Sequence, residues 1–339
     1  MGEESYANSG CDELLTEEEI SLVLDYLLSH KKKFIQEFLR KRGLHFSGTK
    51  EKLRERLECY LDDGRICGTE LVELLNGIEG WGNQHIYLYK APAKYIEPWL
   101  EENSAKKSLG DVGWEELFNR PRPVVLPEEP TLSSIEWTPE KVRFIWVEKR
   151  CWEERIPEKD IKGDNIVWRA YRVNVSRGVI SFELDLMSGD AMLMIRRLPQ
   201  GTKYHQVRDR FENELTPILD FSYFERVRVS QTIRRIQESD EVRRRQLFYQ
   251  TKYGGKIEMT SSSQLEDTFE DPILRRTGED LQKQSAGLLG NFYWLPVKDK
   301  LETEVHCKIY ARDQRVGIFG EHREEDVRYV LSRIRYYCK

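Results

Sequence analysis

The sequence lacks the cysteine patterns that build disulfide frameworks or zinc sites. It has six cysteines, no two of them spaced as Cys-x-x-Cys, and none lies near a histidine at zinc-binding spacing. The six are Cys11, Cys59, Cys67, Cys151, Cys307 and Cys338. Scattered cysteines are typical of reduced thiols in an intracellular protein. We therefore expect no metal site and an intracellular location, cytoplasmic or nuclear depending on the source.

Long hydrophobic runs are also absent. No apolar run at the N-terminus resembles a signal peptide, and no apolar stretch approaches the length of a membrane span. We therefore expect no membrane partner. The chain has 339 residues, of which 39% are hydrophobic, and this is enough apolar material for two or three domains.

The motifs of common cofactor and catalytic sites are missing as well. There is no GxxxxGK loop followed by Ser or Thr, no GxGxxG after a strand, no HExxH and no GxSxG. Gly77, Gly80 and Gly82 surround Trp81 without a following Lys-Ser or Lys-Thr pair, which favours a turn before a strand. We expect no cofactor. These absences do not exclude an enzyme, because a site assembled in space leaves little trace in one sequence.

Positive charge is missing from residues 1–30 and then appears abruptly. This stretch holds eight acidic residues and no Lys or Arg, in a chain of net charge −5. We expect residues 1–15 to form a flexible acidic arm. One interpretation is that the acids fold over the bases that follow and compete with nucleic acid. We favour another, in which Thr16 caps a helix whose dipole stabilises acids in its first turn.

A strongly basic segment follows at residues 31–63, which we call the basic hairpin. Residues 31–57 hold ten Lys and Arg side chains against three Glu, a net charge of +7. Phe34, Ile35, Phe38 and Leu39 recur at helical spacing, and Leu53, Leu57 and Leu61 do the same after the loop. Gly43 suits a left-handed helix end, and Thr49 is a suitable N-cap. The pattern predicts two short helices packed on each other.

The loop and helix start of this hairpin favour phosphate binding, because amides at a helix N-terminus beside Lys attract anions. The segment LRKRGLHFSGTKEKLRERL, residues 39–57, resembles the SAP motif, a small hairpin that binds DNA. The resemblance implies contact with duplex phosphates without sequence preference. The expected contacts are Arg40, Lys41, Ser47, Gly48, Thr49, Lys50 and Arg54. The alternative is a basic hairpin that docks on an acidic protein surface.

The whole chain is predicted to be α+β, with a helical SAP-like module followed by a larger, mainly antiparallel domain. The expected divisions are a helical module at 16–77, a connecting segment at 78–133 and an α+β domain at 134–339. The connecting segment holds a strand at 84–92 and a proline-rich stretch at 119–130. The last domain is expected to hold strands at 142–152, 291–297, 303–310 and 315–319, a meander at 166–195 with turns at 177–178 and 188–190, and helices at 203–219, 225–250 and 322–337.

Two further groups of charged residues are candidates for chemistry. Glu183 and Asp185 lie two apart on one expected strand, as metal-binding carboxylates in some nucleases do. Solvent exposure is the favoured explanation, because the strand's other face is apolar. The second group is the basic segment with Arg234, Arg235, Arg243 and Arg244, which precedes aromatic residues that could stack on unpaired bases. An exposed amphipathic helix is the favoured alternative there.

Three functions follow from these observations. The favoured one is a nucleic-acid-binding accessory protein whose α+β domain binds a protein partner. The second is a nucleic-acid-processing enzyme, such as a nuclease, tethered by the SAP-like module. The third is a protein-interaction scaffold.

Overall fold

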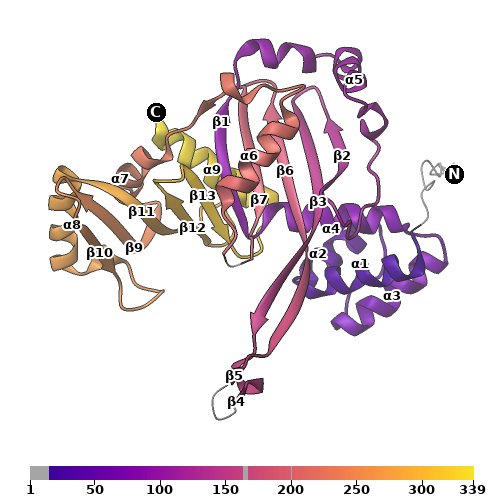
Figure 1. The fold of residues 1–339 in the computed structure, drawn as a ribbon, viewed down its shortest axis with the longest axis horizontal. Coiled ribbons are helices and arrows are strands. Elements are labelled where there is room, and N and C mark those ends of the chain that lie inside the picture. The colour runs from indigo at the N-terminus through magenta and orange to yellow at the C-terminus, as the bar shows by residue number, and fades with distance from the viewer. Residues whose placement is uncertain (1–14, 163–166, 200) are drawn as a thin grey trace.

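The chain folds into a helical bundle joined to one broad antiparallel sheet, as shown by a computed structural model (Figure 1). The structure describes residues 15–162, 167–199 and 201–339. The acidic arm expected over residues 1–15 lies outside this range except for Leu15. The predicted α+β class is confirmed, with the helical region at the N-terminal end of the described chain.

The N-terminal module holds four helices around its own core. They are α1 (Glu17–Ser29), α2 (Lys32–Lys41), α3 (Lys50–Asp62) and α4 (Gly68–Trp81). Leu27, Leu39 and Leu53 are fully buried where the helices meet. Thr16 caps α1 in a capping box with Glu19, as predicted. The helical block expected to end at residue 77 extends to Trp81, because α4 continues through its glycines.

The sheet contains eleven strands in the order β10-β9-β11-β12-β13-β1-β7-β6-β3-β2, with β8 paired to β1. All pairings are antiparallel. The strands are β1 (Gln84–Lys90), β2 (Thr131–Trp137), β3 (Lys141–Arg155), β6 (Tyr171–Asp185), β7 (Asp190–Arg196), β8 (Glu225–Arg226), β9 (Val242–Thr251), β10 (Lys256–Thr260), β11 (Ser285–Trp294), β12 (Val305–Tyr310) and β13 (Arg315–Phe319).

Strand β1 lies in the middle of this sheet, between β13 and β7. It was expected inside a connecting segment, yet both of its faces are buried. Ile86 and Leu88 belong to one core, and Tyr87 and Tyr89 belong to the other. A unit that began at residue 134 would lack this central strand. The sheet domain therefore begins before Gln84.

Helices cover opposite faces of the sheet at its two ends (Figure 1). Helix α6 (Tyr204–Leu215) packs on the face of β1 that carries Tyr87, together with α5 (Glu102–Gly110). Helices α7 (Thr232–Gln237) and α9 (Glu324–Cys338) pack on the opposite face, over β9 to β13. Helix α8 (Pro272–Gln284) lies beside β9 and β11. Short 3-10 helices occur at Ala93–Tyr95, Glu97–Trp99, Glu115–Leu117, Pro157–Lys159, Phe221–Tyr223, Val229–Gln231 and Thr268–Glu270.

Strands β3 and β6 extend past the body of the protein as a long two-stranded arm (Figure 1). The arm comprises residues 151–162 and 167–176, and its tip holds β4 (Ile161–Lys162) and β5 (Val167–Trp168). The turn predicted at residues 177–178 is wrong, because both residues lie inside β6. Gly178 is needed there for space, since a Cβ atom would lie 2.2 Å from Nε of Arg150.

The helix predicted at 225–250 is also wrong for most of its length. Only Thr232–Gln237 is α-helical, and β9 follows. Val242, Leu247 and Tyr249 of β9 are buried in the core. A bulge in the pairing with β11 separates Val242 from the other two and breaks the strict alternation. The bulge and the run of arginines hid the strand pattern from the sequence.

Candidate nucleic-acid interface

The turn that ends α2 is built as the sequence predicts. Gly43 adopts a left-handed conformation with φ of 67°, which costs glycine little. The amide of Leu44 then donates a hydrogen bond of 2.9 Å to the carbonyl oxygen of Leu39, and the Leu44 side chain is buried in the module core. This fixes the direction in which the chain leaves α2 and enters the loop.

The loop at residues 45–49 leads directly into the N-terminus of α3. The Thr49 hydroxyl accepts a hydrogen bond from the Lys52 amide, which confirms the predicted N-cap. Gly48 has a φ of 140°, and a Cβ atom there would lie 3.1 Å from Cβ of Lys52 and 3.5 Å from Nη1 of Arg56. Arg56 also donates a hydrogen bond to the carbonyl oxygen of Ser47. Lys52 and Arg56 therefore flank the glycine loop.

Two of the expected phosphate contacts are engaged inside the module. The Lys50 ammonium donates a hydrogen bond of 2.5 Å to the carbonyl oxygen of Leu28, and its side chain is half-buried. Arg54 forms ion pairs with Asp25 of α1 and, at 2.9 Å, with Glu58. Both side chains tie α3 to its neighbours. They do not extend freely into solvent as the sequence suggested.

The other expected contacts are more exposed. Arg40 has no carboxylate within 4 Å among the described residues, and Lys41 lies 3.9 Å from Glu37. Three further bases are exposed and, like Arg40, have no ion pair in the described chain: Lys32, Lys33 and Lys52. The spacing of residues 33 and 40 places them on one face of α2, away from the buried Ile35 and Leu39. Sequence reasoning identified Arg40 and missed the local role of Lys52.

An anion already sits at the N-terminus of α3. The Glu51 carboxylate accepts hydrogen bonds from its own amide and from the Thr49 side chain, and these bonds lower the pKa of Glu51. Negative charge is favoured at this position because the amides of the first helical turn point outward without helical partners. The site therefore favours anions in this molecule, and Glu51 is the internal competitor for it.

A groove of about 1020 Å³ separates the module from the C-terminal part of the sheet domain. Phe34, Phe38 and Trp81 contribute apolar walls. The rim carries acids and bases in similar numbers, among them Glu37, Lys41, Lys300, Glu302 and Arg323. Because its charges are mixed, this groove lacks the positive surplus that a phosphate backbone requires.

The second predicted basic segment does not form one surface. Arg234 and Arg235 lie on α7, where Arg234 pairs with Glu238 at 3.3 Å and Arg235 donates to the carbonyl oxygen of Tyr337. Arg243 and Arg244 lie on β9 and point to opposite faces of the sheet. Arg243 pairs with Glu304, and Arg244 pairs with Asp267 at 2.8 Å. Each of the four arginines thus has an internal partner.

The acidic pair on β6 also has structural partners. Both carboxylate oxygens of Glu183 accept hydrogen bonds of 2.6 Å from Arg328 of α9, and Glu183 is buried. The explanation by solvent exposure is therefore wrong for Glu183. Asp185 accepts hydrogen bonds from the amides of Met187 and Ser188 and holds the turn into β7.

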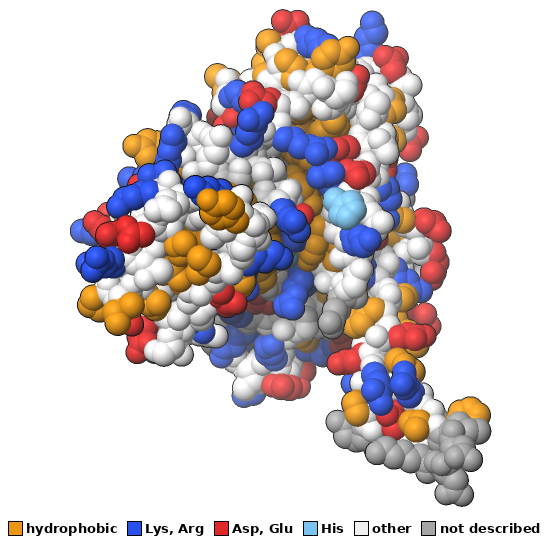
Figure 2. Space-filling model, turned by 60° about the vertical axis from the view of Figure 1, so that its left-hand side comes forward, with side chains coloured by type: hydrophobic (Ala, Val, Ile, Leu, Met, Phe, Trp, Pro, Cys, Tyr) orange, Lys and Arg blue, Asp and Glu red, His pale blue; other side chains and the backbone are white. Residues whose placement is uncertain are grey.

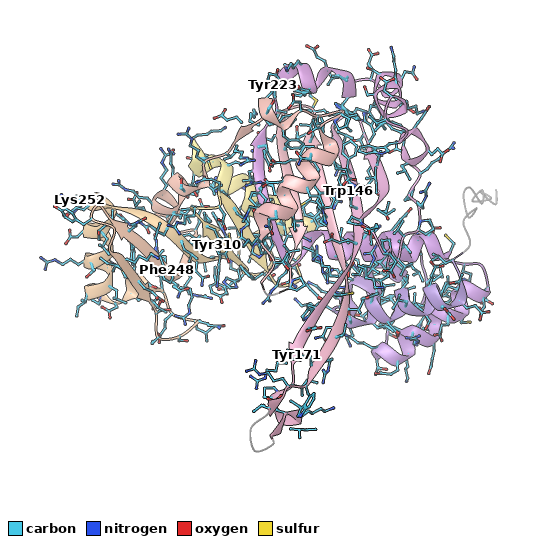
Figure 3. The ribbon with its side chains drawn as sticks, in the orientation of Figure 1. Trp146, Tyr171, Tyr223, Phe248, Lys252 and Tyr310 are labelled. Atoms are coloured by element: carbon cyan, nitrogen blue, oxygen red, sulfur yellow. The ribbon has the colours of Figure 1, made fainter. Side chains whose placement is uncertain are left out.

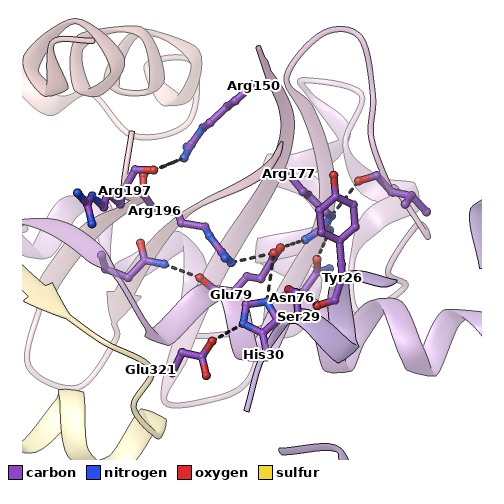
Figure 4. A network of polar contacts seen from close by, with 12 residues as sticks. Tyr26, Ser29, His30, Asn76, Glu79, Arg150, Arg177, Arg196, Arg197 and Glu321 are labelled. Atoms are coloured by element: carbon purple, nitrogen blue, oxygen red, sulfur yellow. Dashed lines mark hydrogen bonds and ion pairs between the residues drawn. The ribbon is translucent and has the colours of Figure 1, made fainter. Parts of the chain in front are cut away.

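A buried ionic network joins the module to the sheet (Figure 4). Its centre is Glu79 of α4, which is 2% exposed. Its carboxylate pairs with Arg177 of β6, with Arg196 of β7 at 2.8 Å, and with His30 at 3.6 Å. His30 in turn contacts Glu321 at 2.7 Å. The four partners of this network lie far apart in the sequence, which explains why sequence reasoning missed it.

The two arginines keep Glu79 ionised despite its burial. Burial alone would raise the pKa of Glu79, but the charges of Arg177 and Arg196 and the contact with His30 lower it to about 2. Arg177 donates further hydrogen bonds to Asn76 and to the carbonyl oxygen of Val125. Glu79, Arg177 and His30 are buried while Arg196 and Glu321 are partly exposed, and the network holds the two regions together.

Comparison with known proteins adds no assignment. No protein family matches the chain, and no curated protein matches it. Across residues 15–162, 167–199 and 201–339, no helix is long and apolar enough to cross a membrane. The same residues hold no group of three or more His, Cys, Asp or Glu side chains suited to a metal ion.

Proposed function

We propose that this protein binds nucleic acid, and that the basic hairpin holds the phosphate backbone of duplex DNA. The observation that carries the proposal is a group of exposed bases without ion pairs in the described chain, Lys32, Lys33 and Arg40 on α2 and Lys52 in the first turn of α3. Bases without internal ion pairs attract a polyanion and release its counterions on binding. In a chain of net charge −5, such a surplus is local to this hairpin.

The proposed contacts differ from those expected from the sequence. The loop at residues 47–49, Lys52 and Arg40 would contact phosphate, with Arg56 supporting the loop. Lys50 and Arg54 would hold α3 in place. Backbone contacts carry no base information, so the proposal predicts similar affinity for unrelated sequences.

A salt titration of DNA binding tests the proposal. If about four phosphates are neutralised, the logarithm of the affinity should fall with the logarithm of salt concentration with a slope of about −3.6. The measurement is fluorescence anisotropy with two labelled duplexes of unrelated sequence. A Lys52→Glu, Arg40→Glu double variant should weaken binding to both duplexes by similar factors and reduce the salt slope.

Lys107→Glu provides the matched control, because Lys107 is an exposed base on α5 outside the hairpin. It makes the same charge change as either single substitution, Lys52→Glu or Arg40→Glu, and should leave affinity nearly unchanged. Equal losses in Lys107→Glu and in either single variant would indicate a general charge effect. Absence of duplex binding at low salt would refute the proposal and favour the scaffold function.

We also propose that the arm carries the protein-partner contact. Its apolar side chains are unusually exposed, with Trp168 at 67%, Val173 at 64% and Tyr171 at 50% (Figure 3 labels Tyr171). Exposed apolar clusters of this kind mark interaction sites. Serine substitutions at Trp168 and Tyr171 should remove partner binding and leave the salt slope of DNA binding unchanged. If the substitutions weaken DNA binding as well as partner binding, the arm and the hairpin do not have separate roles.

A further inference from the structure

One face of the sheet is left open by the helices at its β9–β13 end. In β12, Val305, Cys307 and Ile309 point into the core that contains α7 and α9. Side chains alternate along a strand, so His306 and Lys308 point to the opposite face. On that face α6 covers the part of the sheet around β7, and β11, β12 and β13 lie uncovered beside it (Figure 1).

Strand register arranges the side chains of this open face in three rows. The first row is Arg243, Tyr293, His306 and Phe319; the second is Gln246, Asn291, Lys308, Gly317 and His85; the third is Phe248, Leu289, Tyr310, Arg315 and Tyr87. Five strands contribute to the second and third rows. His85 and Tyr87 of β1 are buried under α6, so the open part of the face spans β9, β11, β12 and β13. With strands about 4.8 Å apart, this part is about 14 Å wide, which is wide enough for a few nucleotides of an extended strand.

Aromatic rings dominate the first row. The rings of Tyr293 and His306 are stacked with centroids 4.5 Å apart, and His306 lies 4.9 Å from Phe319. The guanidinium of Arg243 lies 4.8 Å from the Tyr293 ring. Burial and the nearby Lys308 lower the pKa of His306 to about 4, so its imidazole is neutral at pH 7. The rings of the first row therefore form one continuous aromatic surface.

The third row adds two half-buried rings, Phe248 and Tyr310, while Tyr87 at its β1 end is buried. Arg315 lies between Tyr310 of this row and Tyr204 of α6, with its guanidinium carbon 4.2 Å from each ring centroid. Phe248 is half-buried, and no other ring or cation stacks on it among the described residues (Figure 3 labels Phe248 and Tyr310). Its ring is thus available for a flat ligand.

The second row and the residue after β7 each supply a cation without a carboxylate partner in the described chain. Lys308 and Arg197 have no carboxylate within 4 Å in the described chain. Burial and then the charge of Arg197 lower the pKa of Lys308. Figure 2 shows Lys and Arg side chains gathered in the hollow at the centre of this view. Neighbouring like charges are relieved when an anion binds between them.

We propose that this open face binds an unpaired stretch of nucleic acid, with its phosphates at Lys308 and Arg197 and its bases against the aromatic rows. The combination of rings and unpaired cations matches a ligand that carries both flat π faces and regular negative charge. An acidic peptide supplies the charge without the π faces. Duplex DNA keeps its bases stacked on each other and offers only their edges.

This proposal goes beyond the duplex contact proposed for the basic hairpin, since it concerns other residues and another form of nucleic acid. The two surfaces are tested separately. Lys52→Glu should weaken duplex binding and leave single-strand binding at the sheet nearly unchanged. Lys308→Glu should do the reverse. A failure of duplex binding therefore refutes the proposal for the hairpin and leaves the proposal for the sheet face untouched.

The test is fluorescence anisotropy of the full chain with a labelled 12-nucleotide oligodeoxythymidine (about the site size of such platforms). Lys308→Glu and Phe248→Ala should each weaken binding about tenfold, the loss expected for one base stack or one phosphate contact. Lys308→Arg should restore most of the affinity. Tyr223→Ala is the matched ring control, because Tyr223 is 58% exposed and lies outside the three rows. It should not change the affinity.

Each other outcome overturns the proposal. Absence of binding to the oligonucleotide at low salt removes it outright. If Lys308→Glu weakens binding while Phe248→Ala does not, and polyglutamate displaces the oligonucleotide at equal charge concentration, the face is a general anion surface. Thermal unfolding of every variant shows whether it is folded, and Phe248 and Lys308 are both half-buried positions that tolerate substitution better than core residues.

Discussion

The basic hairpin and the open sheet face present cations in two different ways. The hairpin collects ten bases within 27 residues, and several of them are used to hold its own helices together. The sheet face collects few cations, from residues between 85 and 319, and interleaves them with rings. The density of basic residues in the sequence therefore overestimates the number of cations that the hairpin has free for a ligand. It underestimates the ligand-binding capacity of the sheet face.

The difference has a physical origin. On a short helix, long basic side chains reach carboxylates and carbonyl groups on the neighbouring helices, as Arg54 reaches Asp25. On an uncovered part of a sheet, side chains stand roughly perpendicular to the backbone and meet mainly neighbours in their own and the adjacent rows. Lys308 has no carboxylate within 4 Å in the described chain, and its ammonium lies 5.4 Å from the ring centroid of Phe319 in the adjacent row.

The largest expected effect comes from separating the two regions at their joint. Glu79→Ala removes the carboxylate that holds Arg177 and Arg196 and leaves both guanidinium groups without it. The loss of unfolding free energy should be about 3–5 kcal/mol, as for a broken buried ion pair. Urea unfolding measures it. Glu73→Ala on the same helix is the control and should change stability by less than about 0.5 kcal/mol, because Glu73 has no ion pair in the described residues.

The same carboxylate gives a pH dependence of known sign. The pKa of Glu79 falls from its ordinary value of 4.5 to about 2 in the folded protein. Its contribution is therefore complete above pH 4.5 and is lost as the pH falls toward 2. The loss should reach about 3 kcal/mol. Glu79→Gln should flatten the stability profile in this window, and an unchanged acid limb would show that other carboxylates control it.

A smaller effect is expected at the start of α3. Glu51→Gln removes the internal anion from the helix N-terminus while Thr49 keeps its cap. If a phosphate occupies this position, duplex affinity should rise about two- to fivefold. Glu55→Gln, one turn further along α3, makes the same charge change away from the N-terminus. Equal gains in duplex affinity in the two variants would mean that only the net charge matters. The loop would then not be a phosphate-binding site.

The sequence predicted the local geometry of the hairpin well. Gly43, Thr49 and the leucines that line the two helices have the positions expected of them, because their signals lie within one or two turns of helix. It failed where a side chain meets a distant partner. The engagement of Lys50 with Leu28 and of Glu183 with Arg328 depends on how helices dock, which no local pattern encodes.

The sheet shows the same limit. The strands at 303–310 and 315–319 were predicted from alternation, and both exist as β12 and β13. Alternation shows that a strand has two faces but does not show which face a helix covers. That depends on the order of the strands and on the docking of α6 and α9 at opposite sides. The open face could therefore not be found before the structure.

The central claim is that one molecule holds a duplex at its hairpin and an unpaired strand at its sheet. The most direct measurement compares the affinity of the full chain for a blunt duplex, a 12-nucleotide single strand, and the same duplex carrying that strand as a tail. If both surfaces engage together, the tailed duplex should bind at least about a hundredfold tighter than either part. Lys52→Glu and Lys308→Glu should each abolish that advantage. A tailed duplex that binds no tighter than the better of its two parts would contradict the account.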